Sequence, residues 1–218
     1  MAAGAPTEER QGAPSDDGPA RRVERRDPRR GAVTGPGETV AIGMIVAAKF
    51  GLPLLIVRFP FAAGWGNFFL DSFDGDLLIP LGLSNDVYQP VDKITDWVTY
   101  VAIVLLCYRR AWPTRRLMLA LFVYRSVGQV TFLITGNELV LAFFPNFLEP
   151  LFLVTITILT FERIVRKVPD WHERGFAVLY RYRWVIGIVI VVYKLIDEYI
   201  THVGNIDRSE LLQRLLGG

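Results

Sequence analysis

Long apolar stretches, separated by short polar segments, dominate the chain from residue 39 onward. A helix needs roughly 20 apolar residues to cross a hydrocarbon core that is about 30 Å thick. Five stretches approach that length and are predicted to be transmembrane helices: 39–58, 91–108, 117–135, 139–161 and 184–203. The pattern therefore predicts an all-α, polytopic integral membrane protein with five transmembrane helices.

A sixth apolar stretch, 59–70, is harder to assign. Its 12 residues are too few for a comfortable span, so we expect an interfacial or re-entrant segment there. If this stretch did cross the bilayer, the protein would have six transmembrane helices, which is the alternative to five.

The distribution of lysine and arginine favours the five-span arrangement. With the N-terminus inside, the inner segments 1–38, 109–116 and 162–183 hold seventeen of these residues, and the outer segments hold three. Cytoplasmic loops are enriched in Lys and Arg, so this split predicts the orientation. Six spans would give nine inside and eleven outside. The five-span arrangement places segment 71–96 on the outer side.

The two ends of the chain differ from the apolar middle. Residues 1–38 are rich in Gly, Pro, Arg, Asp and Glu, and cannot bury enough apolar surface to offset the entropy of ordering. We expect a disordered basic N-terminal tail at 1–38, a transmembrane domain at 39–204 and a short amphipathic tail at 205–218. Leucines at 211, 212, 215 and 216 suit a short helix at the membrane interface.

Composition narrows the cellular setting. Arginine far outnumbers lysine, which is typical of a GC-rich bacterial genome, so we expect a multi-pass protein of the bacterial plasma (inner) membrane. The single cysteine, Cys107, excludes an internal disulfide and any multi-cysteine zinc site. Membrane lipids are the expected partners, no nucleic-acid partner is expected, and oligomerisation is left open.

The most unusual segment is the acidic stretch 71–96, whose only basic residue is Lys93. Its aspartates are Asp71, Asp74, Asp76, Asp86, Asp92 and Asp96. Carboxylates beside a bilayer are costly unless they bind or pair with something. Residues four apart share a helix face, and residues three apart in a helix or turn point the same way. We therefore expect Asp71, Asp74, Asp92 and Asp96 to converge around Mg²⁺ or Mn²⁺, while Asp76 and Asp86 do not.

The spacing of these residues resembles a known family. CDP-alcohol phosphatidyltransferases carry the motif D-x2-D-G-x2-A-R-x8-G-x3-D-x3-D across two adjacent membrane helices. The acidic positions and the first glycine are matched here by Asp71, Asp74, Gly75, Asp92 and Asp96. The Ala-Arg pair is replaced by Leu78 and Ile79, and the second glycine by Tyr88. The resemblance covers about 26 residues of the chain.

The resemblance implies a magnesium-dependent enzyme of phospholipid metabolism. Asp71, Asp74 and Asp92 would be metal ligands, Asp96 would be a ligand or the catalytic base, and Gly75 would allow close approach of the nucleotide. The alternative is a non-enzymatic membrane transporter or structural subunit whose acidic cluster binds cations or pairs with Arg125. A third interpretation treats residues 71–76, DSFDGD, as an ordinary Asp/Gly turn.

Arg125 lies deep in the predicted span 117–135 and needs a polar partner there. The candidates are Asp96, Glu149 and Asp71. Glu149 follows Pro145 and Asn146, where the helix is expected to break. We predict a structural ion pair between Arg125 and Glu149 that ties two spans together.

Overall fold

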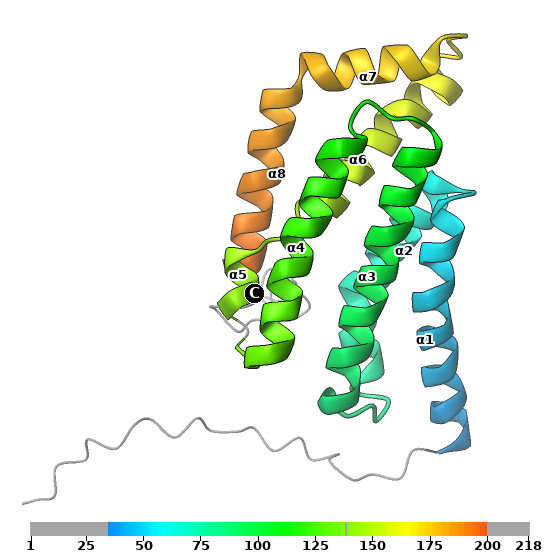
Figure 1. The fold of residues 1–218 in the computed structure, drawn as a ribbon. Helices are drawn as coiled ribbons and strands as arrows, with labels where there is room; N and C mark the ends of the chain where they lie inside the picture. The colour runs from blue at the N-terminus through cyan, green and yellow to red at the C-terminus, as the bar shows by residue number, and fades with distance from the viewer. Residues whose placement is uncertain (1–34, 138, 200–218) are drawn as a thin grey trace, which may run out of the picture.

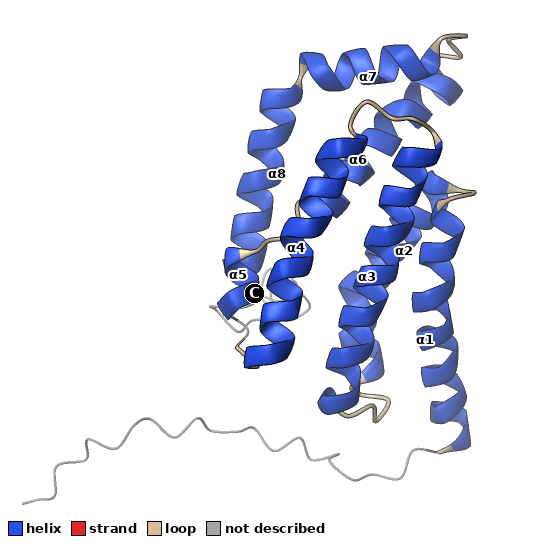
Figure 2. Ribbon diagram, viewed as in Figure 1, coloured by secondary structure: helices blue, strands red, loops and turns tan. Residues whose placement is uncertain are grey.

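The computed structural model describes residues 35–137 and 139–199, which form helices and connecting turns without a β-strand (Figure 2). The elements are α1 (Pro36–Ile56), α2 (Pro60–Leu78), α3 (Asn85–Arg109), α4 (Arg115–Thr135), α5 (Leu139–Phe143), α6 (Leu148–Thr160), the π-helix η1 (Phe161–Val165), α7 (Trp171–Arg181) and α8 (Arg183–Glu198). The all-α class predicted from the apolar pattern is thus confirmed for the described residues.

The long helices lie side by side, and α7 runs across one end of them (Figure 1). Helix α1 packs against α2 and α3, α3 packs against α4, and α6 contacts both α2 and α7. The α1–α2 and α3–α4 connections lie at the end covered by α7, and the α2–α3 connection lies at the opposite end (Figure 1). We call these the α7 end and the acidic end, because the aspartates belong to the halves of α2 and α3 nearest the α2–α3 connection.

Aromatic packing holds α7 in this position. The buried ring of Trp112, in the α3–α4 connection, stacks on Phe152 at 6.2 Å and meets Phe176 edge-on at 5.6 Å. Phe176 and Leu179 are buried three residues apart on α7, so one face of this helix closes the end of the core. The opposite face of α7 is free to carry charge.

Candidate membrane spans among the described residues are fewer than predicted. Helices α1 and α4, each of 21 residues, are long and apolar enough to cross a membrane. Helices α7 and α8, bent by 69° at their junction, qualify only as a pair, as one broken span or a re-entrant loop. Helices α2 and α3 are long enough, but acidic residues interrupt their apolar sequences, while α6 and α8 have only 13 and 16 residues. Length and composition therefore support two or three spans directly, rather than five or six.

The structure differs from the expectation in four stretches. The apolar stretch 59–70 is part of a 19-residue helix, α2, because the helix continues through residues 71–76. That segment is therefore helical and not a turn. The stretch 139–161 is divided at residues 144–147 into α5 and α6, and the segment 162–183, expected as a loop, contains most of η1 and all of α7.

The predicted tails fall largely beyond the residues that the structure describes. Residues 1–34 of the N-terminal tail and all of 205–218 lie outside the described ranges. Helix α1 begins at Pro36, slightly before the expected end of the tail at residue 38.

Candidate functional site

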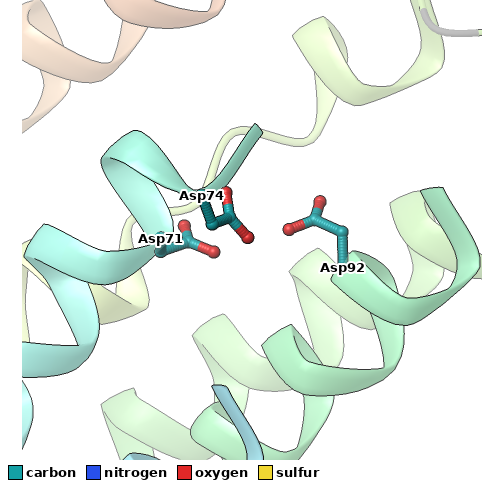
Figure 3. Close-up of side chains that lie close together, drawn as sticks. All are labelled: Asp71, Asp74 and Asp92. Carbon is teal, nitrogen blue, oxygen red and sulfur yellow. The ribbon is translucent and has the colours of Figure 1, made fainter. Parts of the chain in front are cut away.

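Three aspartates from two helices converge at the acidic end. One carboxylate oxygen from each of Asp71, Asp74 and Asp92 lies within 4.8 Å of the others. Figure 3 shows the two carboxylates of α2 facing that of α3. Asp74 is only 1% exposed and Asp71 is 31% exposed, so the cluster extends from the bundle interior toward its surface. We call these three residues the aspartate cluster.

The helical period explains how α2 presents its two aspartates. Asn67, Asp74 and Leu78 are buried on α2, and Asp71 falls on the same stripe, four residues after Asn67 and three before Asp74. Helix α3 contributes Asp92 from a stripe that continues inward through buried Thr95 and Thr99. The face of α2 that carries Asp71 and Asp74 is thus brought against the face of α3 that carries Asp92.

The ammonium group of Lys49, from α1, lies among the three carboxylates. Lys49 is 3% exposed, and its Nζ donates to Asp92 Oδ1 at 2.8 Å and to Asp71 Oδ1 at 3.4 Å. It also donates to Asp74 Oδ2. Lys49 occupies the same face of α1 as buried Pro53 and Ile56, at spacings of four and three residues. One cation therefore ties α1 to both α2 and α3.

A second lysine partly neutralises the cluster from its own helix. Lys93 Nζ donates to Asp92 Oδ2 at 2.7 Å. Lys49 and Lys93 are thus two cationic partners that the described residues supply to the three carboxylates. The donor set fits a divalent cation, because carboxylate oxygens are the ligands that Mg²⁺ and Mn²⁺ prefer. Asp71, Asp74 and Asp92 are the residues that would hold such an ion.

Tyr88 covers the glycine of the predicted motif. Its hydroxyl donates to Asp74 Oδ1 at 2.9 Å. A Cβ atom added at Gly75 would lie 3.1 Å from the Tyr88 hydroxyl oxygen. Gly75 thus permits close approach of the Tyr88 side chain. Since Tyr88 stands where the resembling family has its second glycine, the space next to Gly75 is filled by this chain's own tyrosine.

Asp96 lies one helical turn after Asp92 and has a different partner. Gln129 Nε2, from α4, donates to Asp96 Oδ2 at 3.0 Å. Gln129 is fully buried, and its Oε1 atom has no hydrogen-bond partner among the described residues. Of the four aspartates predicted to converge, the structure brings together Asp71, Asp74 and Asp92, with Asp96 outside that group and directed toward α4.

Arg125 lies in the middle of α4 and donates hydrogen bonds to backbone carbonyls at the break between α5 and α6. Its Nη1 donates to the backbone carbonyl of Phe144 at 2.6 Å and to that of Leu141 at 3.4 Å. The Leu141 carbonyl also accepts from Phe144 N at 3.1 Å. The Phe144 carbonyl lies at the break, where carbonyls lose their helical donors and need others in an apolar setting. Gly128 allows this contact, because a Cβ atom there would lie 2.3 Å from Phe144 Cβ. Arg125 therefore caps an interrupted helix.

Glu149, the predicted partner of Arg125, lies in the first turn of α6 and is buried. It accepts hydrogen bonds from Asn67 Nδ2 at 3.4 Å and from Asn146 Nδ2 at 3.3 Å. The contact with Asn67 links the broken helix to α2. Asn67 also accepts from Thr99 Oγ1 at 3.4 Å, which extends the link to α3. The pairing of Arg125 with Glu149 stays a prediction.

Sequence reasoning missed Lys49, Tyr88 and Gln129. A signal for Lys49 was present, because a lysine within a 20-residue apolar stretch needs a carboxylate partner. The only dense group of carboxylates nearby in the chain begins 22 residues later, at Asp71. No comparable signal marked Tyr88 or Gln129, whose roles depend on which helices pack together.

No family model, curated protein or solved structure matches the chain. The resemblance to CDP-alcohol phosphatidyltransferases therefore stays a prediction that depends on the aspartate spacing.

Proposed function

We propose that the protein is an integral membrane protein that binds a divalent cation, Mg²⁺ or Mn²⁺, through Asp71, Asp74 and Asp92. The observation that carries this proposal is the convergence of one oxygen from each carboxylate within 4.8 Å. An acidic group inside a membrane bundle otherwise carries a large desolvation cost.

Lys49 gives this site a second property. Its ammonium group and a divalent cation would use the same carboxylate oxygens, so the two compete for the cluster. Binding of the cation would release Lys49 and loosen the attachment of α1 to α2 and α3. This exchange fits the non-enzymatic class, a transporter or a structural subunit, because intramembrane ionisable groups mark ion pathways and switchable contacts.

The test is the thermal unfolding of the purified full chain in detergent, with and without Mg²⁺ or Mn²⁺. A ligand that binds only the folded state raises its stability by mass action. We expect the cation to raise the melting temperature of the wild type and of Asp76→Asn, an exposed aspartate of the same helix. The response should be lost in Asp74→Asn and Asp92→Asn. An equal response in all four proteins would contradict the site.

A phosphatidyltransferase-like activity is the second candidate. It is favoured by Asp96, which follows Asp92 by one turn and stands at the position of the catalytic base in the resembling motif. In such a site Asp96 would accept the proton of the attacking alcohol. A bound divalent cation would neutralise phosphate charge. Tyr88 over Gly75 and Ile79 in place of the motif's arginine weigh against a bound nucleotide.

Release of CMP from CDP-diacylglycerol and an acceptor alcohol tests this second candidate. The enzyme hypothesis requires that Asp96→Asn abolishes the release while the stabilisation by Mg²⁺ persists. Stabilisation by the cation without release of CMP would remove the enzyme hypothesis and leave the cation site in place.

We further propose that the bundle crosses the membrane six times, through α1, α2, α3, α4, α6 with η1, and α8. The support is that these helices lie side by side and that the acidic residues of α2 and α3 face each other and Lys49. Charges paired inside the bundle do not prevent a helix from crossing, because they do not face lipid.

The charges in the connections indicate the orientation. Eleven lysines and arginines of the described residues lie at the α7 end: Arg58, Arg109, Arg110, Arg115, Arg116, Arg163, Arg166, Lys167, Arg174, Arg181 and Arg183. Within 35–137 and 139–199, the connections at the acidic end contain no lysine or arginine. By the positive-inside rule this distribution favours a cytoplasmic α7 end and an aspartate cluster toward the outer side. With six crossings the seven arginines of 1–38, with Arg208 and Arg214, fall on the outer side, so the split over the whole sequence is eleven against nine.

Two engineered thiols distinguish six crossings from five. Gly37→Cys and Ser84→Cys, each combined with Cys107→Ala, place single thiols at exposed positions on either side of α1 and α2. With six crossings an impermeant thiol reagent labels both variants in intact cells. With five, as the sequence predicts, only Ser84→Cys is labelled before permeabilisation. Labelling of neither variant would reverse the orientation.

A further inference from the structure

An apolar groove runs along the outer side of α3 and α4 near the α7 end. It has a volume of about 270 Å³ and is lined by Val101, Val104, Leu105, Tyr108 and Phe122. The four α3 residues recur at helical spacing and share one face of that helix. From Val101 to Tyr108 the wall extends about 10 Å along the helix axis, at 1.5 Å per residue.

The groove is open to the surroundings of the bundle. Val101 is 51% exposed, and Leu105 and Tyr108 are also exposed. Large apolar side chains that remain exposed around a hollow indicate an apolar ligand or a lipid. Helix α4 is long and apolar enough to span a membrane, so the groove beside it would face the hydrocarbon chains of lipids. A lipid acyl chain is therefore the apolar ligand expected there.

The end of the groove nearest the α7 end is positively charged. Arg115 places its Cζ atom 6.0 Å from the centre of the Tyr108 ring. Arg115 also precedes Phe122 by seven residues, so these two side chains occupy the same face of α4. Arg109 and Arg116 are exposed in the adjoining turns. A groove of apolar side chains thus ends at a guanidinium group.

This combination matches an anionic phospholipid, and we propose that the groove binds one such molecule. An acyl chain lies against Val101, Val104 and Leu105, and the phosphate contacts the Arg115 guanidinium. Arginine suits this role because its planar fork of donors matches phosphate oxygens. Basic pockets between membrane helices bind anionic headgroups for the same electrostatic reason.

The arginines of α7 offer a contrast within the same molecule. Arg174 is exposed on α7, yet it is not among the residues that line this groove. Such a residue adds to the general attraction of an anionic membrane surface without defining a place for one lipid. Arg174→Gln is therefore the matched control for Arg115→Gln.

The experiment measures lipid binding to the full chain in detergent, by native mass spectrometry with phosphatidylglycerol or phosphatidylcholine. We expect the wild type to bind phosphatidylglycerol more tightly than phosphatidylcholine. In Arg115→Gln the affinity for phosphatidylglycerol should fall about fivefold, the usual effect of one basic residue at an anionic surface. Arg174→Gln should leave it unchanged, and Arg115→Lys should retain part of it.

A second pair of variants tests the apolar part of the groove. Val104→Phe fills the hollow without changing any charge, so it should weaken phosphatidylglycerol binding. Ile188→Phe, on an exposed face of α8, should have no effect. Equal binding of the two lipids, an equal loss in Arg174→Gln, or unchanged binding in Val104→Phe would each overturn the proposal. Only protein that melts cooperatively is scored, so misfolded variants do not enter the comparison.

Discussion

The two ends of the helical bundle handle charge in opposite ways. At the acidic end, Lys49 and the aspartate cluster are largely withdrawn from the surface and paired with one another across three helices. At the α7 end, arginines such as Arg109 and Arg116 are exposed. Buried ion pairs hold helices together inside the bundle, whereas exposed cations interact with water and lipid headgroups outside it.

The difference follows from where the charges are placed along the helices. Lys49, Asp74 and Asp92 belong to helix interiors, so they must find partners before the apolar faces can pack. Most arginines of the α7 end lie at helix termini or in connections, and Arg174 is exposed within α7. In these places long side chains reach water or rest on aromatic rings. Arg163, for example, lies 5.4 Å from the ring of Trp171. Stability should therefore depend strongly on charge at one end and weakly at the other.

Removal of the shared cation should have the largest effect. Lys49→Met would leave three carboxylates without their common partner, and breaking a buried pair in this way costs roughly 3–5 kcal/mol. We expect a much lower melting temperature in detergent. Mg²⁺ or Mn²⁺ should restore more stability to Lys49→Met than it adds to the wild type, since the ion no longer competes with the ammonium group. A melting temperature equal to that of the wild type, without added cation, would show that Lys49 is not what neutralises the cluster.

Arg125 extends the comparison between buried and exposed charges, because it is a buried arginine that donates to backbone carbonyls and not to a carboxylate of the cluster. Arg125→Ala would remove a donor from the carbonyls of Leu141 and Phe144. The Leu141 carbonyl still accepts from Phe144 N at 3.1 Å, so we expect a cost of roughly 1–3 kcal/mol from the Phe144 carbonyl. Arg125→Lys should recover part of the loss. Melting in detergent measures both variants, and an unaltered melting temperature in Arg125→Ala would mean that other groups or water satisfy the α5–α6 break.

Tyr88 and Gly75 test how closely the acidic end is packed. Tyr88→Phe removes a hydrogen bond to a carboxylate, which should cost about 1.5–3 kcal/mol. Gly75→Ala should destabilise the wild type, because the new methyl group lies close to the Tyr88 hydroxyl, and should cost less in the Tyr88→Phe background. A double-mutant cycle measures this coupling. Strict additivity would indicate that the two residues do not touch in solution.

The smallest effect is expected at the α7 end. Arg163→Gln loses an exposed cation–π contact, which is worth about 0.5–1 kcal/mol. The change in melting temperature should be small and insensitive to Mg²⁺. If Arg163→Gln were as damaging as Lys49→Met, the contrast between the two ends would be wrong.

Much of the local structure could be predicted from the apolar pattern. The positions of α1, α3, α4 and α8 follow the predicted spans closely, and a break near Pro145 and Asn146 was expected. The end expected for 59–70 was wrong, because the aspartates at 71, 74 and 76 end the apolar run without ending the helix. Aspartate is compatible with a helix when its carboxylate finds a partner, and that partner, for Asp74, is in another helix.

The candidate site shows the same division. The helical period alone places Asp71 near Asp74 and Asp92 near Asp96 on shared faces. The helical period does not predict contacts between helices. It could not show that Lys49 would pair with the aspartate cluster, that Asp96 would accept from Gln129, or that Tyr88 would pack on Gly75. Those contacts join residues on different helices, and each depends on which faces pack together. The sequence by itself thus determined most of the long helices and the chemistry on each face. Only the tertiary structure decided the partners, because packing is set by all the helices at once.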